Sequence, residues 1–227
     1  MTTKDDITEG FQIFTDPQRI SRNLAQRVRN DQVDQRHNKA TVYTNRACIN
    51  NRKENAKCRA RVWFGQNDPR NCSLKVPGKD QSNQVGEIAA IIMAIQNTPN
   101  FCPLEIVSDF RYIIEGLTKH LPKWEDQGWT EIKNTSLFKK AAHLLKRRSA
   151  KTTFTWVKGH RGTPGNEESN RLAKEGAESE RNILLDLKIP IEFNVQGAKL
   201  AIITQVIAYQ SIRKKRQEEP RLEAKEC

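Results

Sequence analysis

The chain has 227 residues, of which 36% are hydrophobic and 29% charged, and its formal net charge is +12. Apolar runs such as Ile88–Ile95 exclude disorder throughout, no run approaches the ~18 apolar residues of a membrane span, and the polar start Met1–Asp6 gives no sign of a secretion signal. A sequence pI near 9.6 is typical of a protein that binds a polyanion. The length predicts one domain with extensions.

Short strands and amphipathic helices alternate over residues 40–180, which predicts an α/β domain. Strands bounded by turn residues are expected at 41–44, 60–64, 73–76, 104–108 and 154–157. Helices with apolar residues at helical spacing are expected at 88–95, 112–117, 137–145 and 167–177. The first three strands predict an antiparallel meander. The whole order predicts a mixed five-stranded sheet with helices on its faces.

Two extensions flank this domain. Residues 1–39 are polar, with one apolar patch at Phe11, Ile13 and Phe14 that could pin the segment to the domain. Residues 181–227 carry an apolar strip and then the basic run 213–216, which predicts an appended helix with a charged tail. Both extensions are candidates for binding a protein partner.

The five cysteines are spread along the chain with no Cys-x-x-Cys pair. An odd set of isolated cysteines argues against a disulfide framework and against a zinc site. It favours a reducing compartment, the nucleus or the cytoplasm. We therefore expect most of the cysteines to be small core residues.

Polar residues gather at the ends of the predicted elements. Asn45 ends the first strand, Glu87 opens the first helix and Asp109 ends the fourth strand. Asn170 lies in the last helix, and His160 lies in the Gly-rich loop before it. Because strand ends and helix starts at the same edge of a sheet converge on one crevice, we expect a site there.

Four motifs stand in order between residues 40 and 177: Val-Tyr-Thr at 42–44, Ser-Asn-Gln-Val-Gly-Glu at 82–87, Ile-Val-Ser-Asp at 106–109, and Trp-Val-Lys-Gly-His at 156–160 with Gly-Asn-Glu-Glu at 165–168. Together they resemble the type 1 ribonuclease H family, and within it the ribonuclease H segments of fungal retroelement polyproteins. The resemblance implies a ribonuclease H-like α/β fold.

The resemblance also implies a metal site in which four carboxylates hold two Mg²⁺ or Mn²⁺ ions that cut the RNA strand of an RNA–DNA hybrid. Glu87 and Asp109 stand at two of the four positions, whereas Asn45 and Asn170 stand at the others. An amide offers only a neutral oxygen to a hard cation, so we expect weak metal binding at most. His160 matches the family's mobile histidine, which helps proton transfer or product release. A catalytically impaired nuclease is the result we expect.

Two neighbouring positions also depart from the family. Arg46 stands where the family has Gly, and Phe110 stands where it usually has Ser. A guanidinium at position 46 could lie beside Glu87 and Asp109 and partly replace a missing cation. Natural decay and a laboratory Asp-to-Asn change are both open as origins of the site. A laboratory Asp-to-Asn change traps a nuclease with its substrate and would not require Arg46 or Phe110. Their presence therefore favours natural decay.

Other residues match family positions that contact nucleic acid without a metal ion. Asn51, Asn83 and Gln84 resemble the minor-groove readers, whose amides bond 2′-hydroxyls. Ordinary turn and helix-start residues are the alternative interpretation.

The segment 119–129 resembles the basic handle that grips the DNA strand, with Lys119, Lys123 and Trp124 as its candidate contacts. The tryptophan could pack against sugars or anchor the loop to the core. The cation run between residues 139 and 151 favours phosphate contact over a merely solvated helix face, and its candidates are Lys146, Arg147 and Arg148.

The sequence thus predicts a ribonuclease H-like domain that binds RNA–DNA hybrid or structured RNA and is impaired as an enzyme. One alternative is a working metal-dependent endoribonuclease in which amide oxygens, a single ion or Mn²⁺ suffice. Another is a protein-interaction module that uses the extensions and retains only vestigial nucleic-acid binding. No membrane partner is expected.

Overall fold

The structure is a computed structural model, and it describes residues 39–50, 57–78, 81–158, 185–190, 194 and 197–218. Five strands form one sheet in the order β3-β2-β1-β4-β5. They are β1 (Ala40–Ile49), β2 (Lys57–Trp63), β3 (Cys72–Lys75), β4 (Leu104–Ser108) and β5 (Thr152–Trp156). The first three strands pair antiparallel, whereas β4 lies parallel to β1 and β5 lies parallel to β4. The predicted meander and the mixed five-stranded sheet are therefore confirmed.

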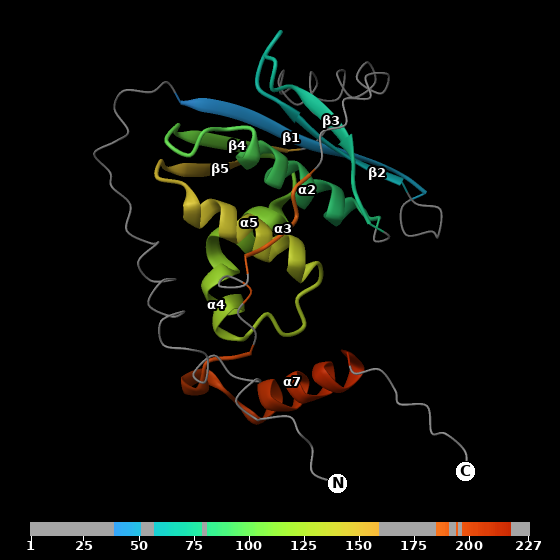
Figure 1. Cartoon of the computed structure of the whole chain (residues 1–227), viewed down its shortest axis with the longest axis vertical. Coiled ribbons are helices and arrows are strands. Elements are labelled where there is room, and N and C mark those ends of the chain that lie inside the picture. The colour runs from blue at the N-terminus through green and yellow to red at the C-terminus, as the bar shows by residue number, and fades with distance from the viewer. Residues whose placement is uncertain are drawn as a thin grey trace.

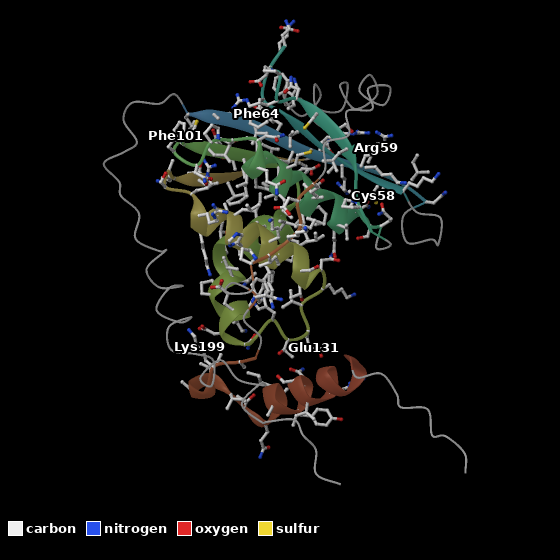
Figure 2. The ribbon with its side chains drawn as sticks, in the orientation of Figure 1. Cys58, Arg59, Phe64, Phe101, Glu131 and Lys199 are labelled. Carbon is white, nitrogen blue, oxygen red and sulfur yellow. A yellow bond between two sulfur atoms is a disulfide. The ribbon has the colours of Figure 1, made fainter. Side chains whose placement is uncertain are left out.

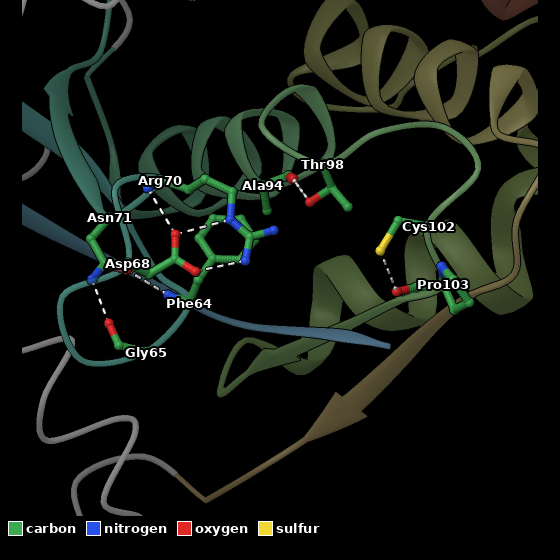
Figure 3. Close-up of polar contacts among 9 residues, drawn as sticks. All are labelled: Phe64, Gly65, Asp68, Arg70, Asn71, Ala94, Thr98, Cys102 and Pro103. Atoms are coloured by element: carbon green, nitrogen blue, oxygen red, sulfur yellow. Dashed lines mark hydrogen bonds and ion pairs between the residues drawn. The ribbon is translucent and has the colours of Figure 1, made fainter. Parts of the chain in front are cut away.

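The turn between β2 and β3 is closed by polar side chains (Figure 3). Arg70 binds the Asp68 carboxylate at 2.6 Å, and its guanidinium stacks 4.1 Å from the centre of the Phe64 ring. Asn71 accepts a hydrogen bond from the Phe64 backbone and donates one to the Gly65 carbonyl. This turn chemistry fixes the register in which β2 and β3 pair.

A disulfide joins β1 to β2, whereas the sequence argued against a disulfide framework and favoured isolated core cysteines. Cys48 and Cys58 are cross-strand partners in the antiparallel register, with their Cα atoms 4.1 Å apart. The expectation failed because pairing depends on strand register, and cysteine spacing along the chain does not reveal it. Among the described residues, Cys72 and Cys102 are not joined in a disulfide.

Helices cover one face of the sheet (Figure 1). Helix α2 (Asn83–Gln96) packs directly on β1 and β2, and every residue from Val85 to Ile95 is buried. Its N-terminus is capped by the Ser82 hydroxyl, which accepts a hydrogen bond from the Val85 backbone. Helix α5 (Thr135–Arg147) packs on α2. The burial of both helices places the hydrophobic core between the sheet and α5.

The short helix expected at 112–117 is longer in the structure. It continues as α3 (Arg111–Glu115), the π-helix η4 (Gly116–His120) and α4 (Leu121–Asp126). Trp124 turns inward from α4 and packs edge-on against Phe138 of α5, with ring centroids 4.9 Å apart. Trp129 packs against Trp124, so both tryptophans lie in the core.

The C-terminal part of the chain packs on this domain as well. Lys140 of α5, although only 3% exposed, binds Asp186 and the Lys188 carbonyl. The Lys199 backbone then donates a hydrogen bond to Asp126 at the end of α4, and the short helix η6 (Leu200–Ile202) leads into α7 (Gln205–Glu218). Helix α7 lies within residues 181–227, the segment for which the sequence predicts an appended helix. Residues 1–38 of the N-terminal extension and the helix expected at 167–177 lie outside the described residues.

Of the helices in the described ranges, none combines the length and the apolar character that a membrane crossing requires.

Candidate functional site

Asn45 lies inside β1, not at its end. The strand continues to Ile49, and Asn45 pairs with Arg61 of β2. The expected strand end was wrong because residues 46–49 lack the β-branched pattern and extend only through their ladder with β2. Asn45 is 5% exposed, and its side-chain oxygen accepts a hydrogen bond from the Arg46 backbone at 2.7 Å.

Asp109 follows β4, which lies beside β1 in parallel. Glu87 lies one turn into α2, which packs on β1 and β2 and also contacts β4. The negative charge of Asp109 contributes to raising the pKa of Glu87, so the two carboxyl groups interact electrostatically. Glu87 and Asp109 therefore belong to one site, to which β1 contributes Arg46, the residue that follows Asn45.

Glu87 is fully buried and forms an ion pair with Arg46. The Nη1 atom of Arg46 lies 2.7 Å from Glu87 Oε1, and the two side chains are 23% and 0% exposed. Burial raises the pKa of Glu87 to about 7, and this shift would be larger if the Arg46 guanidinium did not oppose it. Arg46 thus supplies the positive charge that this buried carboxylate requires.

The surroundings of Arg46 hold its side chain at the site. Its guanidinium lies 5.3 Å from the centre of the Phe110 ring, within cation–π range. Gly86 leaves room on the other side, because a Cβ there would stand only 3.1 Å from the Arg46 Cβ. The two residues that depart from the family pattern, Arg46 and Phe110, are therefore packed together.

The residues that the structure describes around Glu87 do not fit a pair of divalent ions. Within the described ranges, no three His, Cys, Asp or Glu side chains lie together as a metal cluster. The carboxylates at hand are those of Asp109 and Glu87, and a cation already binds Glu87. The buried atoms Glu87 Oε2 and Asp109 Oδ1 have no hydrogen-bond partner among the described residues, so they are the oxygens at which the site could still bind positive charge. His160 and Asn170 lie outside the described residues.

The predicted minor-groove readers lie next to this site. Asn83 is the first residue of α2, and Gln84 follows it, so both precede Glu87 by about one turn. The Gln84 side-chain oxygen accepts a hydrogen bond from Asn134 at 3.2 Å, which joins the start of α2 to the start of α5. Both residues are partly exposed. Asn51 lies outside the described residues.

The predicted cationic contacts divide into exposed and internal residues. Lys119, Lys123 and Arg147 are exposed to solvent. Lys119 also forms an i,i+4 ion pair with Glu115 at 3.4 Å. These three cations remain candidates for phosphate contact.

Three other predicted contacts serve the fold. Trp124 is 8% exposed within the aromatic cluster, which corresponds to the core-anchor alternative. Arg148 is 4% exposed, and its guanidinium donates to the Thr98 and Cys102 carbonyls and to the Thr152 hydroxyl. Lys146 is bound to Glu125. Arg148 and Trp124 cannot reach a phosphate or a sugar without leaving these contacts, so we correct their assignment.

The strand order, the parallel centre of the sheet and the site between β1, β4 and α2 define the ribonuclease H fold class. The family model for RNase H matches residues 37–178, more than half of the sequence. The chain therefore belongs to the ribonuclease H family.

Curated relatives agree with this assignment. Ribonuclease H of Schizosaccharomyces pombe is 36% identical over 141 residues, which is 60% of this chain and 52% of that protein. Ribonuclease H1 of Homo sapiens is 33% identical over 141 residues, 60% of this chain and 49% of that protein. The chain thus spans about half the length of these two relatives. Ribonuclease H of Pseudomonas paraeruginosa is 33% identical over 102 residues, 43% of this chain and 68% of that protein.

Solved structures show the same fold. LC9-RNase H1, described as a type 1 RNase H with the type 2 active-site motif, has a TM-score of 0.50 and 22% identity, and it covers 63% of this chain and 74% of its own. A prototype foamy virus protease-reverse transcriptase mutant has a TM-score of 0.50 and 23% identity over 61% of this chain and 20% of its own.

Proposed function

We propose that this chain is a ribonuclease H-family domain that binds RNA–DNA hybrid or structured RNA and has lost nearly all hydrolytic activity. The observation that carries the proposal is the ion pair between Arg46 and the buried Glu87. Members of the family normally use divalent metal ions, Mg²⁺ or Mn²⁺. Here the Arg46 guanidinium forms an ion pair with the Glu87 carboxylate, which such an ion would need as a ligand. Weak metal binding at most is the consequence.

The loss of anionic ligands and the gain of an internal cation both weaken metal binding at the site. Asn45 and Asn170 remove two negative charges relative to the family pattern, and Arg46 adds one positive charge. A site with two carboxylates and a guanidinium carries a net charge of about −1, which is far from the charge that two divalent ions require. Kinship with fungal retroelement segments, and natural decay as the origin of the site, stay predictions.

Nucleic-acid binding does not depend on these charges. The net charge of +12 favours a polyanion, and Lys119, Lys123 and Arg147 are exposed cations on the domain. Asn83 and Gln84 present amides at the start of α2, where a minor groove could be read through its 2′-hydroxyls. Nucleic-acid binding and the loss of hydrolysis therefore depend on different residues.

Cleavage of a labelled RNA–DNA hybrid in Mg²⁺ and in Mn²⁺ tests the proposal. We expect no measurable cleavage by the wild type and little by Asn45→Asp/Asn170→Asp, because Arg46 still binds Glu87. Adding Arg46→Gly to that pair should restore activity. Robust cleavage by the wild type at physiological Mg²⁺ would contradict the proposal and favour the working endoribonuclease.

Thermal stability gives a second measurement that needs no activity. A ligand stabilises the folded state in proportion to its binding, so Mg²⁺ should leave the melting temperature of the wild type unchanged. The triple variant gathers four carboxylates that repel one another without metal. It should therefore melt lower than the wild type in chelator and recover when Mg²⁺ is added. An equal rise for both proteins would show that the native site still binds metal.

A further inference from the structure

Helix α7 exposes an apolar strip. Val206, Tyr209 and Ile212 are 63%, 67% and 53% exposed, and they recur every three residues along the helix. Ile202, in the short helix η6 before α7, is 37% exposed as well. Residues at this spacing share one face of a helix, so the strip is continuous. Large apolar side chains gathered in this way mark an interaction surface.

The opposite face of α7 is already used. Ile207 is only 9% exposed, and Ser211 shares a hydrogen bond with Thr130 at 3.5 Å. The chain just before α7 is fixed to α4, because the Lys199 backbone donates to the Asp126 carbonyl at 2.8 Å and its side chain binds the same residue. In Figure 2, Lys199 and Glu131 lie beside α7, whereas Phe101 lies at the far end of the molecule. The helix is thus held in place with its apolar strip turned outward.

Positive charge adjoins the strip. Arg213 is exposed, and the sequence continues with Lys214, Lys215 and Arg216. Positions 213 and 216 fall on the same helical face as Val206 and Tyr209, given 3.6 residues per turn. A partner for this face should therefore be apolar and acidic. A second copy of the chain fits poorly, because it would bring another net charge of +12 against this one.

The chain contains a segment with that composition. Residues 5–16 hold four acidic residues and no Lys or Arg, which gives a formal charge of −4. The same twelve residues contain four large apolar side chains, namely Ile7, Phe11, Ile13 and Phe14. The charge and the apolar content of this segment complement those of the α7 face.

The segment can reach α7. Twenty-two residues separate Asp16 from Lys39, where the domain begins, and they span up to about 70 Å when extended. A compact domain of this size has a diameter of about 40 Å. Being on the same chain, the segment is present near α7 at a high effective concentration, which favours it over a free partner.

We propose that residues 5–16 dock on the exposed face of α7. Phe11 and Phe14 cover the strip of Val206, Tyr209 and Ile212, and the acidic residues face the basic run 213–216. The contact joins the two extensions of the chain into one surface, away from the Arg46–Glu87 site. It does not depend on the proposed function.

Hydrogen exchange of the full chain, followed by mass spectrometry, tests the docking. Amides in residues 5–16 should exchange at least about tenfold more slowly than those of an unstructured peptide of the same sequence. Tyr209→Ser should return them to the peptide rate. The matched control is Phe101→Ser, which removes an aromatic side chain that is 47% exposed at the far end of the molecule and should leave the protection intact.

A charge exchange separates docking from nonspecific burial. Asp5→Lys/Asp6→Lys should abolish the protection, and adding Arg213→Glu/Arg216→Glu should restore part of it. Fast exchange of residues 5–16 in the wild type would overturn the proposal. Protection that rises with protein concentration would overturn it in favour of a second copy. Protection that Tyr209→Ser leaves unchanged would place the segment elsewhere and overturn it too.

Discussion

Arg46 gives the buried Glu87 carboxylate its counter-charge, and this leads to a pH-dependent prediction. Replacing Arg46 with Met leaves Glu87 buried without a partner, so its pKa rises further above the ordinary 4.5. At a pH between 4.5, the pKa of Glu87 in the unfolded chain, and its raised pKa in the folded variant, the folded state binds more protons than the unfolded state. The stability of the variant therefore falls as the pH rises. Because the pKa of Glu87 in the wild type is already about 7, we expect Arg46→Met to cost up to about 1.4 kcal/mol more at pH 8 than at pH 5. Urea unfolding in chelator at the two pH values measures the difference.

A second variant separates the charge effect from a loss of packing. Arg46→Met/Glu87→Gln removes both charges, so position 87 should make no pH-dependent contribution to its stability between pH 5 and pH 8, whereas in the wild type the raised pKa of Glu87 should lower stability as the pH rises. If Arg46→Met loses the same free energy at both pH values, the guanidinium is not the counter-charge of Glu87.

Among the elements, β1 and β2 are tied by the Cys48–Cys58 bond. Closing a loop of this length restricts the unfolded chain and is worth about 2–3 kcal/mol. Reductant should therefore lower the melting temperature of the wild type. It should have no effect on Cys48→Ala/Cys58→Ala, which melts low from the start. Equal melting temperatures for oxidised wild type and the double variant would mean that the bond contributes nothing to stability.

The contact between the turn after α4 and the C-terminal segment depends on Gly128. Its φ is +65°, and a Cβ there would overlap the Gly197 backbone. Gly78 also has a positive φ, +93°, but open space around it. Gly128→Ala should therefore cost about 2–4 kcal/mol, whereas Gly78→Ala should cost only about 1 kcal/mol for its backbone. Chemical denaturation measures both, and similar losses would show that the close approach to Gly197 is unimportant.

At the scale of the whole molecule, the sequence predicts the sheet well because its strands carry their own pattern. In β2, Cys58, Ala60 and Val62 are buried in alternation, and β4 is a short apolar run. The predicted order of strands and helices agrees with the structure wherever the structure describes it. The extra length of β1 escaped prediction, since it comes from pairing with β2 and not from residue type.

The site was only partly predictable for a related reason. Motif order identifies Asn45, Glu87 and Asp109, and the charge of Arg46 suggests its place beside them. A run of cations, by contrast, does not tell which members face water. Arg148 turns inward because carbonyls of the loop before β4 accept its hydrogen bonds, and those partners lie about 50 residues away in sequence.

The division between exposed and internal cations leads to a prediction for nucleic-acid binding by the whole domain. Neutralising Lys123 and Arg147 with Gln should weaken binding of hybrid and duplex DNA alike. Each lost phosphate contact should reduce the slope of the logarithm of the binding constant against the logarithm of the salt concentration by about 0.9. Asn83→Ala should instead reduce the preference for hybrid, because its amide would address 2′-hydroxyls. Competition titrations at two salt concentrations measure both effects.

Arg148→Gln is the matched control, because it removes the same charge from a residue whose partners are internal. It should lower the melting temperature and leave the salt slope of the remaining folded protein unchanged. If Arg148→Gln lowers the slope as much as Arg147→Gln does, Arg148 contacts phosphate after all. If the wild type binds neither hybrid nor duplex DNA at moderate salt, the basic charge serves another partner, and the interaction-module alternative replaces nucleic-acid binding.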